Sequence, residues 1–254
     1  MKEITKDNLL VKISESRLLM GQLAAENVSA KITALLKVQP MVNMIFAAAP
    51  SQNEFLAALL KKELPWEKIN AFHMDEYLGL DAEAPQGFGN FLKNALFNLL
   101  PLNSVHYLNG NAADAEEECL RYSELLAQYP ADIVCMGIGE NTHLAFNDPH
   151  VADFNDRTLV KVVDLDQQCR MQQVNDGCFE DLDRVPTHAL TLTVPALFKA
   201  RYVFCIVPGP KKADAVKYTL TADVSEKYPS TILRTHAEAI LYLDADSSST
   251  LFKM

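Results

Sequence analysis

Residues 43–49 (Asn-Met-Ile-Phe-Ala-Ala-Ala) and residues 132–138 (Asp-Ile-Val-Cys-Met-Gly-Ile) are two short apolar runs in this 254-residue chain. Runs of this length and composition are typical of strands that are buried on both faces of a parallel sheet. Residues 69–74, 202–207 and 239–243 have the same character. The sequence therefore predicts five buried parallel strands.

Helical stretches separate these strands, and several of them have apolar residues spaced three and four apart. They are expected at residues 18–36, 53–64, 88–99, 113–128 and 211–220. Strands that alternate with helices form a mostly parallel sheet covered on both faces. We therefore expect a three-layer α/β/α sandwich around a mainly parallel, Rossmann-like sheet. The more polar segment 158–193 is expected to form a lid or an extra hairpin.

The composition is that of a single globular domain over residues 1–254, because 49% of the residues are hydrophobic and no repeat or long linker interrupts the chain. A net charge of −10 without a basic run excludes nucleic acid as a probable partner. The first ten residues lack the apolar stretch of a signal peptide, and no run approaches the ~20 apolar residues of a membrane span. The five cysteines have no metal-binding or redox spacing. A cytoplasmic protein with reduced thiols is expected.

Polar residues follow four of the predicted strands. Ligands of open α/β sheets bind at the carboxyl ends of the strands, because helix N-termini and loops converge there. The residues at these ends are Ser51 and Gln52, Asp75 and Glu76, Glu140, Asn141 and His143, and Lys211 and Lys212. The sequence thus predicts that acids, an imidazole and cations share one rim of the sheet.

Several of these residues have an ordinary structural interpretation as well as a functional one. Ser51 could be a helix N-cap, or it could bind a phosphate together with the N–H groups of the loop 47–52. Lys212 could be solvated, although a cation near a helix N-terminus is unfavourable unless an anion neutralises it. Asp75 and Glu76 could cap the next turn, or Asp75 could act as a base.

His143 has two interpretations of the same kind. It could be a surface histidine, or a carboxylate such as Asp148 could make it an acid/base group. A metal site of His73, Asp75, Glu76 and His143 is disfavoured, because no second histidine at a fixed spacing completes the ligand set. The sequence therefore predicts no metal.

Two long motifs resemble those of the glucosamine-6-phosphate deaminases. Residues 72–77 (Phe-His-Met-Asp-Glu-Tyr) are similar to the family's F-N-M-D-E-Y, and residues 137–149 are similar to G-x-G-x-D-G-H-I-A-F-N-E-P. The wider superfamily includes 6-phosphogluconolactonases, whose histidine motif usually continues differently. The ending Ala145–Pro149 therefore favours the deaminase branch. The resemblance extends over nearly the whole chain.

The resemblance implies an enzyme that isomerises and deaminates an amino sugar 6-phosphate without a metal or organic cofactor. It assigns the proton transfer between C2 and C1 to Asp75, and ring opening to His143 with Asn141 and Asp148 beside it. It further implies a substrate-binding set that also holds the phosphate. That set comprises Ala48, Ala49, Ser51, Gln52, Glu76, Arg170 and Lys212. A homo-oligomer is compatible with this family.

The sequence also departs from the family pattern. Residues 48–52 read Ala-Ala-Pro-Ser-Gln where Thr-Gly-Gly-Thr-Pro is usual, and Asn141 stands in place of an aspartate. Without that aspartate, His143 must rely on Asp148 or on Glu140 for a negative charge. These changes suggest a divergent subgroup with another epimer, such as galactosamine 6-phosphate.

Three further expectations follow from the comparison with the family. Some hexameric relatives bind an effector near the segment that matches Arg157–Lys161, but Leu159 replaces a basic residue there, so we expect no such activation. A lactonase of the same superfamily is one alternative function. A sugar-phosphate sensor without catalytic activity is another.

Overall fold

The computed structural model describes residues 1–251 and contains one sheet of eight strands and one of three. The large sheet has the order β1-β2-β11-β10-β7-β3-β4-β6, and all neighbours are parallel except β1 and β2. Its strands are β1 (Lys2–Lys6), β2 (Leu9–Ile13), β3 (Val42–Phe46), β4 (Ile69–His73), β6 (Ser104–His106), β7 (Ile133–Met136), β10 (Tyr202–Val207) and β11 (Ala239–Leu243). The predicted mainly parallel sheet is confirmed.

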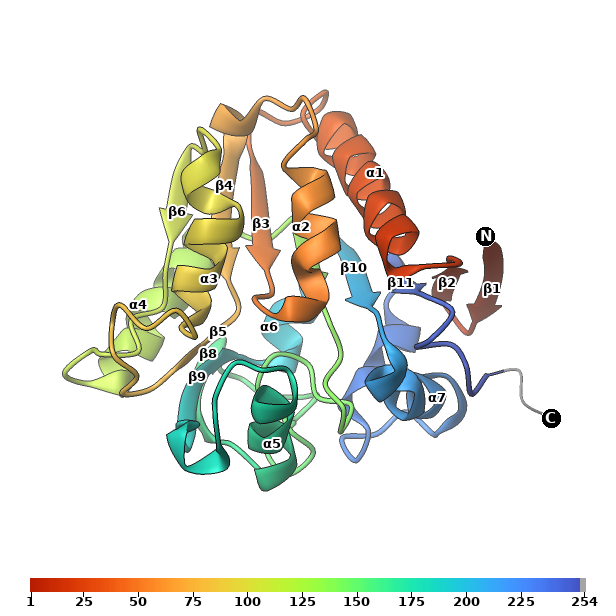
Figure 1. Cartoon of the computed structure of the whole chain (residues 1–254). Helices are drawn as coiled ribbons and strands as arrows, with labels where there is room; N and C mark the ends of the chain where they lie inside the picture. Colours follow the sequence, from red (N-terminus) through yellow and green to blue (C-terminus); the bar gives the residue numbers. More distant parts are fainter. Residues whose placement is uncertain (252–254) are drawn as a thin grey trace.

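Helices cover both faces of the large sheet. Figure 1 shows α1, α2 and α3 in front of the strands, and their apolar side chains belong to one core cluster. Side chains of α4, α6 and α7 belong to a second cluster. The helices are α1 (Arg17–Leu35), α2 (Asn53–Leu59), α3 (Phe88–Ala95), α4 (Ala115–Gln128), α5 (Gln167–Asn175), α6 (Val194–Phe198) and α7 (Ala213–Thr221).

The central strands supply side chains to both clusters. In β7, Ile133 and Cys135 belong to the first cluster, and Val134 and Met136 belong to the second. Consecutive strand residues point to opposite faces, so a strand covered on both sides has no polar face. This requirement explains the continuous apolar runs in the sequence, and it confirms the three-layer arrangement.

The small sheet consists of β5 (Asp75–Tyr77), β9 (His188–Leu192) and β8 (Val160–Asp164), which pair antiparallel. The chain enters it directly after β4, where Leu192 N–H donates to the carbonyl of Met74 over 2.8 Å. Strands β8 and β9 form the pair expected within residues 158–193, and α5 lies in the connection between them. Figure 1 places α5 below the carboxyl ends of the large sheet.

Some elements differ from the predicted ones. The first predicted helix begins after Ser16, whose side chain accepts a hydrogen bond from Leu19 N–H. Helix α2 ends at Leu59 and is preceded by the 3-10 turn Pro50–Gln52, so it is shorter than the predicted 53–64. Strands β1, β2 and β6 escape prediction. Strands β1 and β6 are edge strands with partly exposed side chains, and β2 alternates buried with half-buried residues, so the three lack the fully buried pattern of the central strands.

Two expectations from composition can be compared with the structure. All five cysteines are free, and four of them are buried. None of the helices in residues 1–251 combines the length and the apolar character needed to cross a bilayer. The thiols therefore contribute to packing and not to covalent cross-links.

Candidate active site

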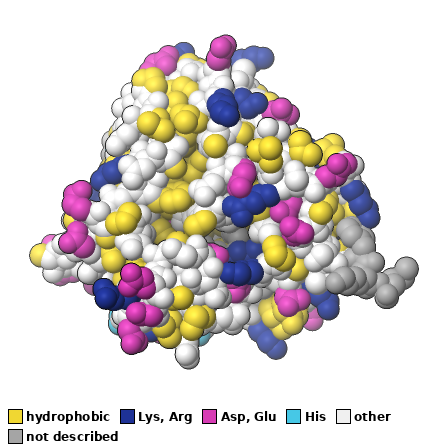
Figure 2. Space-filling model, in the orientation of Figure 1, with side chains coloured by type: hydrophobic (Ala, Val, Ile, Leu, Met, Phe, Trp, Pro, Cys, Tyr) yellow, Lys and Arg dark blue, Asp and Glu magenta, His cyan; other side chains and the backbone are white. Residues whose placement is uncertain are grey.

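The strand order of the large sheet changes direction between β3 and β7. Strands β3, β4 and β6 follow one another to one side, and β7, β10 and β11 follow to the other. A crevice opens at the carboxyl ends of the strands at such a point. The segments that leave β3 and β7 both line a pocket of about 480 Å³, open mouth included. Figure 2, in the orientation of Figure 1, shows a hollow near the centre of the molecule.

Most of the predicted site residues line this one pocket. They are Ala48, Ala49, Ser51, Gln52, Asp75, His143 and Lys212. They come from the ends of four different strands of the large sheet, β3, β4, β7 and β10. The fold therefore brings together the acid, the imidazole and the cation that the sequence separates by up to 137 residues, from Asp75 to Lys212 (212 − 75).

Asp75 is a buried carboxyl group without a hydrogen-bond partner on one oxygen. The residue is only 6% exposed, and no donor in residues 1–251 reaches its Oδ1 atom. Burial raises the pKa of Asp75 well above its usual range, and the nearby charge of Glu76 raises it further. A carboxylate with a raised pKa is a stronger base than an exposed one, so Asp75 can accept a proton once it is ionised.

Two side-chain oxygens contact the Nδ1 atom of His143. Its Nδ1 atom lies 2.7 Å from Oδ1 of Asn141 and 3.0 Å from Oδ1 of Asp148. Because both oxygens act as acceptors here, Nδ1 carries the proton and donates. The Nε2 atom has no protein partner among residues 1–251 and remains available to a ligand. The negative charge therefore comes from Asp148 and not from Glu140.

Asp148 is completely buried and remains an anion. Burial opposes its ionisation, but the hydrogen bond and charge of His143, with donors from Asn141 and Asp166, outweigh burial and lower its pKa. The Asn141 amide donates both to Asp148 over 2.9 Å and to Asp166 over 3.0 Å. An aspartate at position 141 could not donate to either. This contact gives a physical reason for the departure from the family pattern.

The loop around His143 has an unusual backbone. Thr142 has φ 73° and Ala145 has φ 50°, in the left-handed region that side chains, and β-branched ones most of all, rarely adopt. At Gly139, a Cβ atom would lie only 2.2 Å from Cε1 of His143. Glycine is therefore required at position 139 for the imidazole to occupy its place.

The opposite part of the pocket provides donors for an anion. The backbone N–H groups of Ala48 and Ala49 donate to no protein acceptor within residues 1–251. The Lys212 side chain is buried, and no ion pair in the described part of the chain involves it. Burial lowers the pKa of Lys212, whereas Asp176 and Glu140 oppose this change. A bound anion would favour the charged form of Lys212 in the same way as these two acids.

Two predicted substrate-binding residues do not line the pocket, because the protein engages their side chains elsewhere. Glu76 accepts hydrogen bonds from the N–H groups of Phe88 and Gly89 over 3.0 and 2.8 Å, so it caps α3. The Arg170 guanidinium donates to the carbonyls of Leu182 and Val185 over 2.6 and 2.8 Å. Arg170 thus holds the loop that follows α5, and it lines a different pocket.

The disfavoured metal set is not assembled. His73 does not line the pocket: its Nε2 accepts from Leu108 N–H over 2.8 Å, and burial lowers its pKa to about 3. A different group, His143, Asp148 and Cys169, has ligand atoms within 4.8 Å of one another. In that group, hydrogen bonds already engage the imidazole and the carboxylate.

Sequence reasoning missed the contribution of α5 to the pocket. Gln172 and Gln173 are buried and line the pocket, and Gln172 also accepts from Glu140 N–H over 2.8 Å. For the polar segment 158–193 the sequence predicted a lid or an extra hairpin, without a helix that contributes to the pocket. Only the position of this helix below the strand ends explains why its glutamines are buried.

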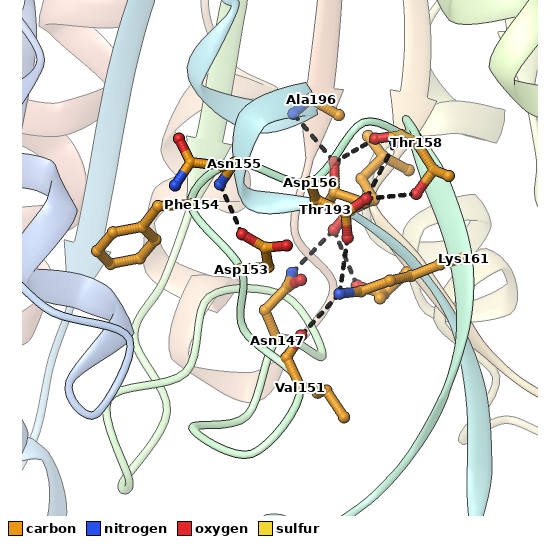
Figure 3. A network of polar contacts seen from close by, with 12 residues as sticks. Asn147, Val151, Asp153, Phe154, Asn155, Asp156, Thr158, Lys161, Thr193 and Ala196 are labelled. Atoms are coloured by element: carbon orange, nitrogen blue, oxygen red, sulfur yellow. Dashed lines mark hydrogen bonds and ion pairs between the residues drawn. The ribbon is translucent and has the colours of Figure 1, made fainter.

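A polar network fixes the segment between the His143 loop and β8, as Figure 3 shows. Lys161 donates to the carbonyl of Val151 over 2.7 Å and to Asp156 over 3.0 Å. Asp156 also accepts from the hydroxyl of Thr158, whose carbonyl accepts from the hydroxyl of Thr193. The ammonium group of Lys161 is therefore engaged within the protein.

The sequence model of "Glucosamine-6-phosphate isomerases/6-phosphogluconolactonase" matches residues 15–242. The chain belongs to this family. It is 35% identical over 243 residues to a protein of Bacillus cytotoxicus named glucosamine-6-phosphate deaminase, a match that covers 95% of this chain and 88% of the relative. A Bacillus cereus protein of the same name is 35% identical over 213 residues, which cover 84% of this chain and 79% of the relative.

Solved structures of the family have the same fold. A monomeric glucosamine-6-phosphate deaminase superposes with a TM-score of 0.84 at 28% identity, over 94% of this chain and 98% of that one. The 6-phosphogluconolactonase of Thermotoga maritima superposes with a TM-score of 0.76 at 20% identity, over 93% of this chain and 99% of that one. The lactonase similarity concerns the fold alone.

Proposed function

We propose that this family member is an amino sugar phosphate isomerase/deaminase, which converts glucosamine 6-phosphate or galactosamine 6-phosphate to the ketose 6-phosphate and ammonia. The observation that carries the proposal is the common pocket of Asp75, His143 and Lys212. The 35% identity to proteins named deaminase supports the same reaction.

Ring opening is the first step of the proposed reaction. Nε2 of a protonated His143 would donate a proton to the ring oxygen as the C1–O5 bond breaks, and the C1 hydroxyl would release its proton to solvent. The Asp148 carboxylate lies 3.0 Å from Nδ1, so it orients the imidazole and leaves Nε2 available to the sugar. This geometry supports the role of general acid for His143.

Proton transfer between C2 and C1 is the second step. The ionised Asp75 would remove the C2 hydrogen while the C1 oxygen takes a proton from solvent, forming an enolamine, and Asp75 would then return its proton to C1. The result is a ketimine at C2. Water then adds at C2 and ammonia leaves, so that one water is consumed for each ammonia released. These steps as written need no metal or organic cofactor.

The phosphate would be held by Lys212, the Ser51 hydroxyl and the N–H groups of Ala48 and Ala49, which line the same pocket. A charged hydrogen bond to a phosphate oxygen is roughly twice as strong as a neutral one. Few cations line the pocket, so these groups must supply most of the affinity for the anion.

Ammonia release tests the proposed function. The protein would be incubated with glucosamine 6-phosphate and with galactosamine 6-phosphate, and ammonia measured beside a 6-phosphogluconolactone hydrolysis assay. Ammonia from one of the two sugars is the expected result, and the faster substrate identifies the epimer. Lactone hydrolysis without ammonia release would instead assign a lactonase. Thermal stabilisation by the sugars without turnover of any substrate would indicate a sensor.

We also propose that no sugar-phosphate effector activates the enzyme through the segment 157–161. Lys161 is engaged by Val151 and Asp156, and Leu159 offers no charge. Initial rates measured over a range of substrate concentrations should follow a hyperbola, with the same parameters when an N-acetylated amino sugar 6-phosphate is added. Activation by that compound would contradict this expectation.

A further inference from the structure

Ser51 and Gln52 form a pair of polar side chains at the pocket wall. Nε2 of Gln52 donates to Ser51 Oγ over 3.1 Å and to the carbonyl of Ile206 over 3.1 Å. Gln52 is 1% exposed, so these contacts are shielded from water. The pair stands where the family pattern has a threonine and a proline, and a proline could make neither contact.

The carbonyl of Ile206 decides which end of the Gln52 amide is the nitrogen. A backbone carbonyl only accepts, so the atom that faces it must be the NH₂ group. Both hydrogens of Nε2 are then used, one by the carbonyl and one by Ser51. The amide cannot flip without placing two oxygens against each other.

This assignment fixes the direction of the Ser51 hydroxyl group. Ser51 Oγ accepts from an NH₂ group, which has no lone pair to receive a hydrogen in return. The hydroxyl hydrogen must therefore point elsewhere, and no acceptor in residues 1–251 receives it. Because Ser51 lines the pocket, a bound ligand can accept this hydrogen.

Two further observations suggest that a ligand completes the pair. Oε1 of Gln52 is buried without any donor in the described chain, which leaves an acceptor for a ligand hydroxyl. Gly137 lies against the pair, and a Cβ atom there would be 3.1 Å from Gln52 Nε2 and 3.7 Å from Ser51 Oγ. A larger residue at position 137 would crowd the pair, so glycine leaves room for both side chains.

We propose that Gln52 is a positioning residue, which holds the Ser51 hydroxyl as a donor toward the phosphate of the bound sugar. The inference rests on the proposed function for the identity of the ligand. Gln52 acts on the phosphate through Ser51 and not by a contact of its own. An ordered hydroxyl binds an anion better than a rotating one, because its direction need not be fixed on binding.

A double-mutant cycle with sulfate tests this proposal. Sulfate stays a dianion between pH 5 and pH 8 and has no hydrogen to donate, so it reports on donors and not on Gln52 Oε1. Its dissociation constant would be measured by calorimetry for the wild type, Ser51→Ala, Gln52→Met and the double variant. We expect a loss of roughly tenfold for Ser51→Ala, as for a hydrogen bond to a charged group. Gln52→Met should lose about threefold to tenfold.

The double variant gives the decisive result. It should bind sulfate within about twofold of Ser51→Ala alone, since Gln52 has no effect once the hydroxyl is absent. If the double variant loses sulfate affinity by the product of the two single losses, the proposal is overturned, because Gln52 would then act independently of Ser51. An unchanged sulfate affinity in Gln52→Met would overturn it as well.

Gln52→Glu is a second variant of nearly the same shape, should the methionine variant fail to fold. An ionised carboxylate cannot donate to Ser51, so its sulfate affinity should fall below that of wild type at pH 8 and recover toward pH 5. The recovery should be smaller in the Ser51→Ala background. A loss that does not change with pH, or an equal recovery in both backgrounds, would contradict the assigned role. Sulfate binding is independent of ammonia release, so a wrong substrate assignment would be distinguishable.

Discussion

Asp75 and Asp148 are two buried aspartates of the same candidate site in opposite surroundings. Asp75 has no donor on Oδ1, and burial raises its pKa well above the usual range. Asp148 is even less exposed, but His143, Asn141 and Asp166 donate to it, and together they outweigh burial and lower its pKa. Burial alone therefore does not decide the charge of a carboxyl group, because its donors do.

This difference assigns a role to each aspartate. A carboxyl group with a raised pKa and a free oxygen can take up and return a proton, whereas a saturated carboxylate serves as a permanent negative charge. In the proposed reaction, Asp75 would therefore carry the proton transfer and Asp148 would provide electrostatic support. The following experiments would break or sharpen this separation.

Asp75→Asn should have the largest effect. It removes the proposed base while keeping the shape, so ammonia release should fall about 10³-fold and exchange of the C2 hydrogen with deuterium oxide should stop. Nuclear magnetic resonance of the substrate would follow the exchange, and calorimetry would test for retained binding. The exposed Asp183→Asn is a matched control without an expected effect. Exchange that continues in Asp75→Asn would refute the assignment.

Asp148→Asn should lower the rate by about 10²-fold, because Nδ1 of His143 would lose the carboxylate that orients the imidazole. Its unfolding midpoint should also fall, since His143 would lose an ionised partner. Asp164→Asn is the matched control, because Asp164 forms an exposed pair of the same kind with His150, over 3.0 Å. Equal rates for wild type and Asp148→Asn would remove Asp148 from the mechanism.

Asp75→Asn should raise the unfolding temperature, whereas Asp148→Asn should lower it. In wild type, the unfolded chain ionises Asp75 near pH 3.9, but the folded protein holds the proton up to its raised pKa, so folding stability falls as pH rises through that window. Asparagine has no such penalty. The variant should therefore unfold at a higher temperature than wild type at pH 8, by roughly 2–4 °C for each kcal/mol gained. Calorimetric scans at pH 4 and pH 8 should show the gain growing with pH, and a gain that shrinks would contradict the raised pKa.

Thr142→Gly should have the smallest effect. It relieves a β-branched residue at φ 73° whose buried hydroxyl has no partner in residues 1–251. We expect a gain of about 0.5–1 kcal/mol in unfolding free energy, after the entropy that glycine adds to the unfolded chain. Urea titration would measure it, with Ala145→Gly as a less strained comparison. A loss of stability would mean that Thr142 makes favourable contacts that outweigh its strain.

The sequence predicted the parts of the fold that are buried on both faces. Strands β3, β4, β7, β10 and β11 were recognisable because a two-sided core requires apolar side chains at every position. The edge strands β1 and β6 carry no such requirement and were missed. The pairing of β5 with β9 also joins residues far apart in the chain, which local patterns do not reveal.

For the site, the sequence by itself determined which residue types follow the strand ends, and its motifs identified Asp75, His143 and Lys212. Only the tertiary structure decided which polar groups face the pocket, since it directs Glu76 to the start of α3 and Arg170 to a loop. It also decided that Asp75 lacks a donor while Asp148 has several. The physical reason is that hydrogen bonding and burial depend on neighbours in space, whereas the sequence specifies only neighbours along the chain.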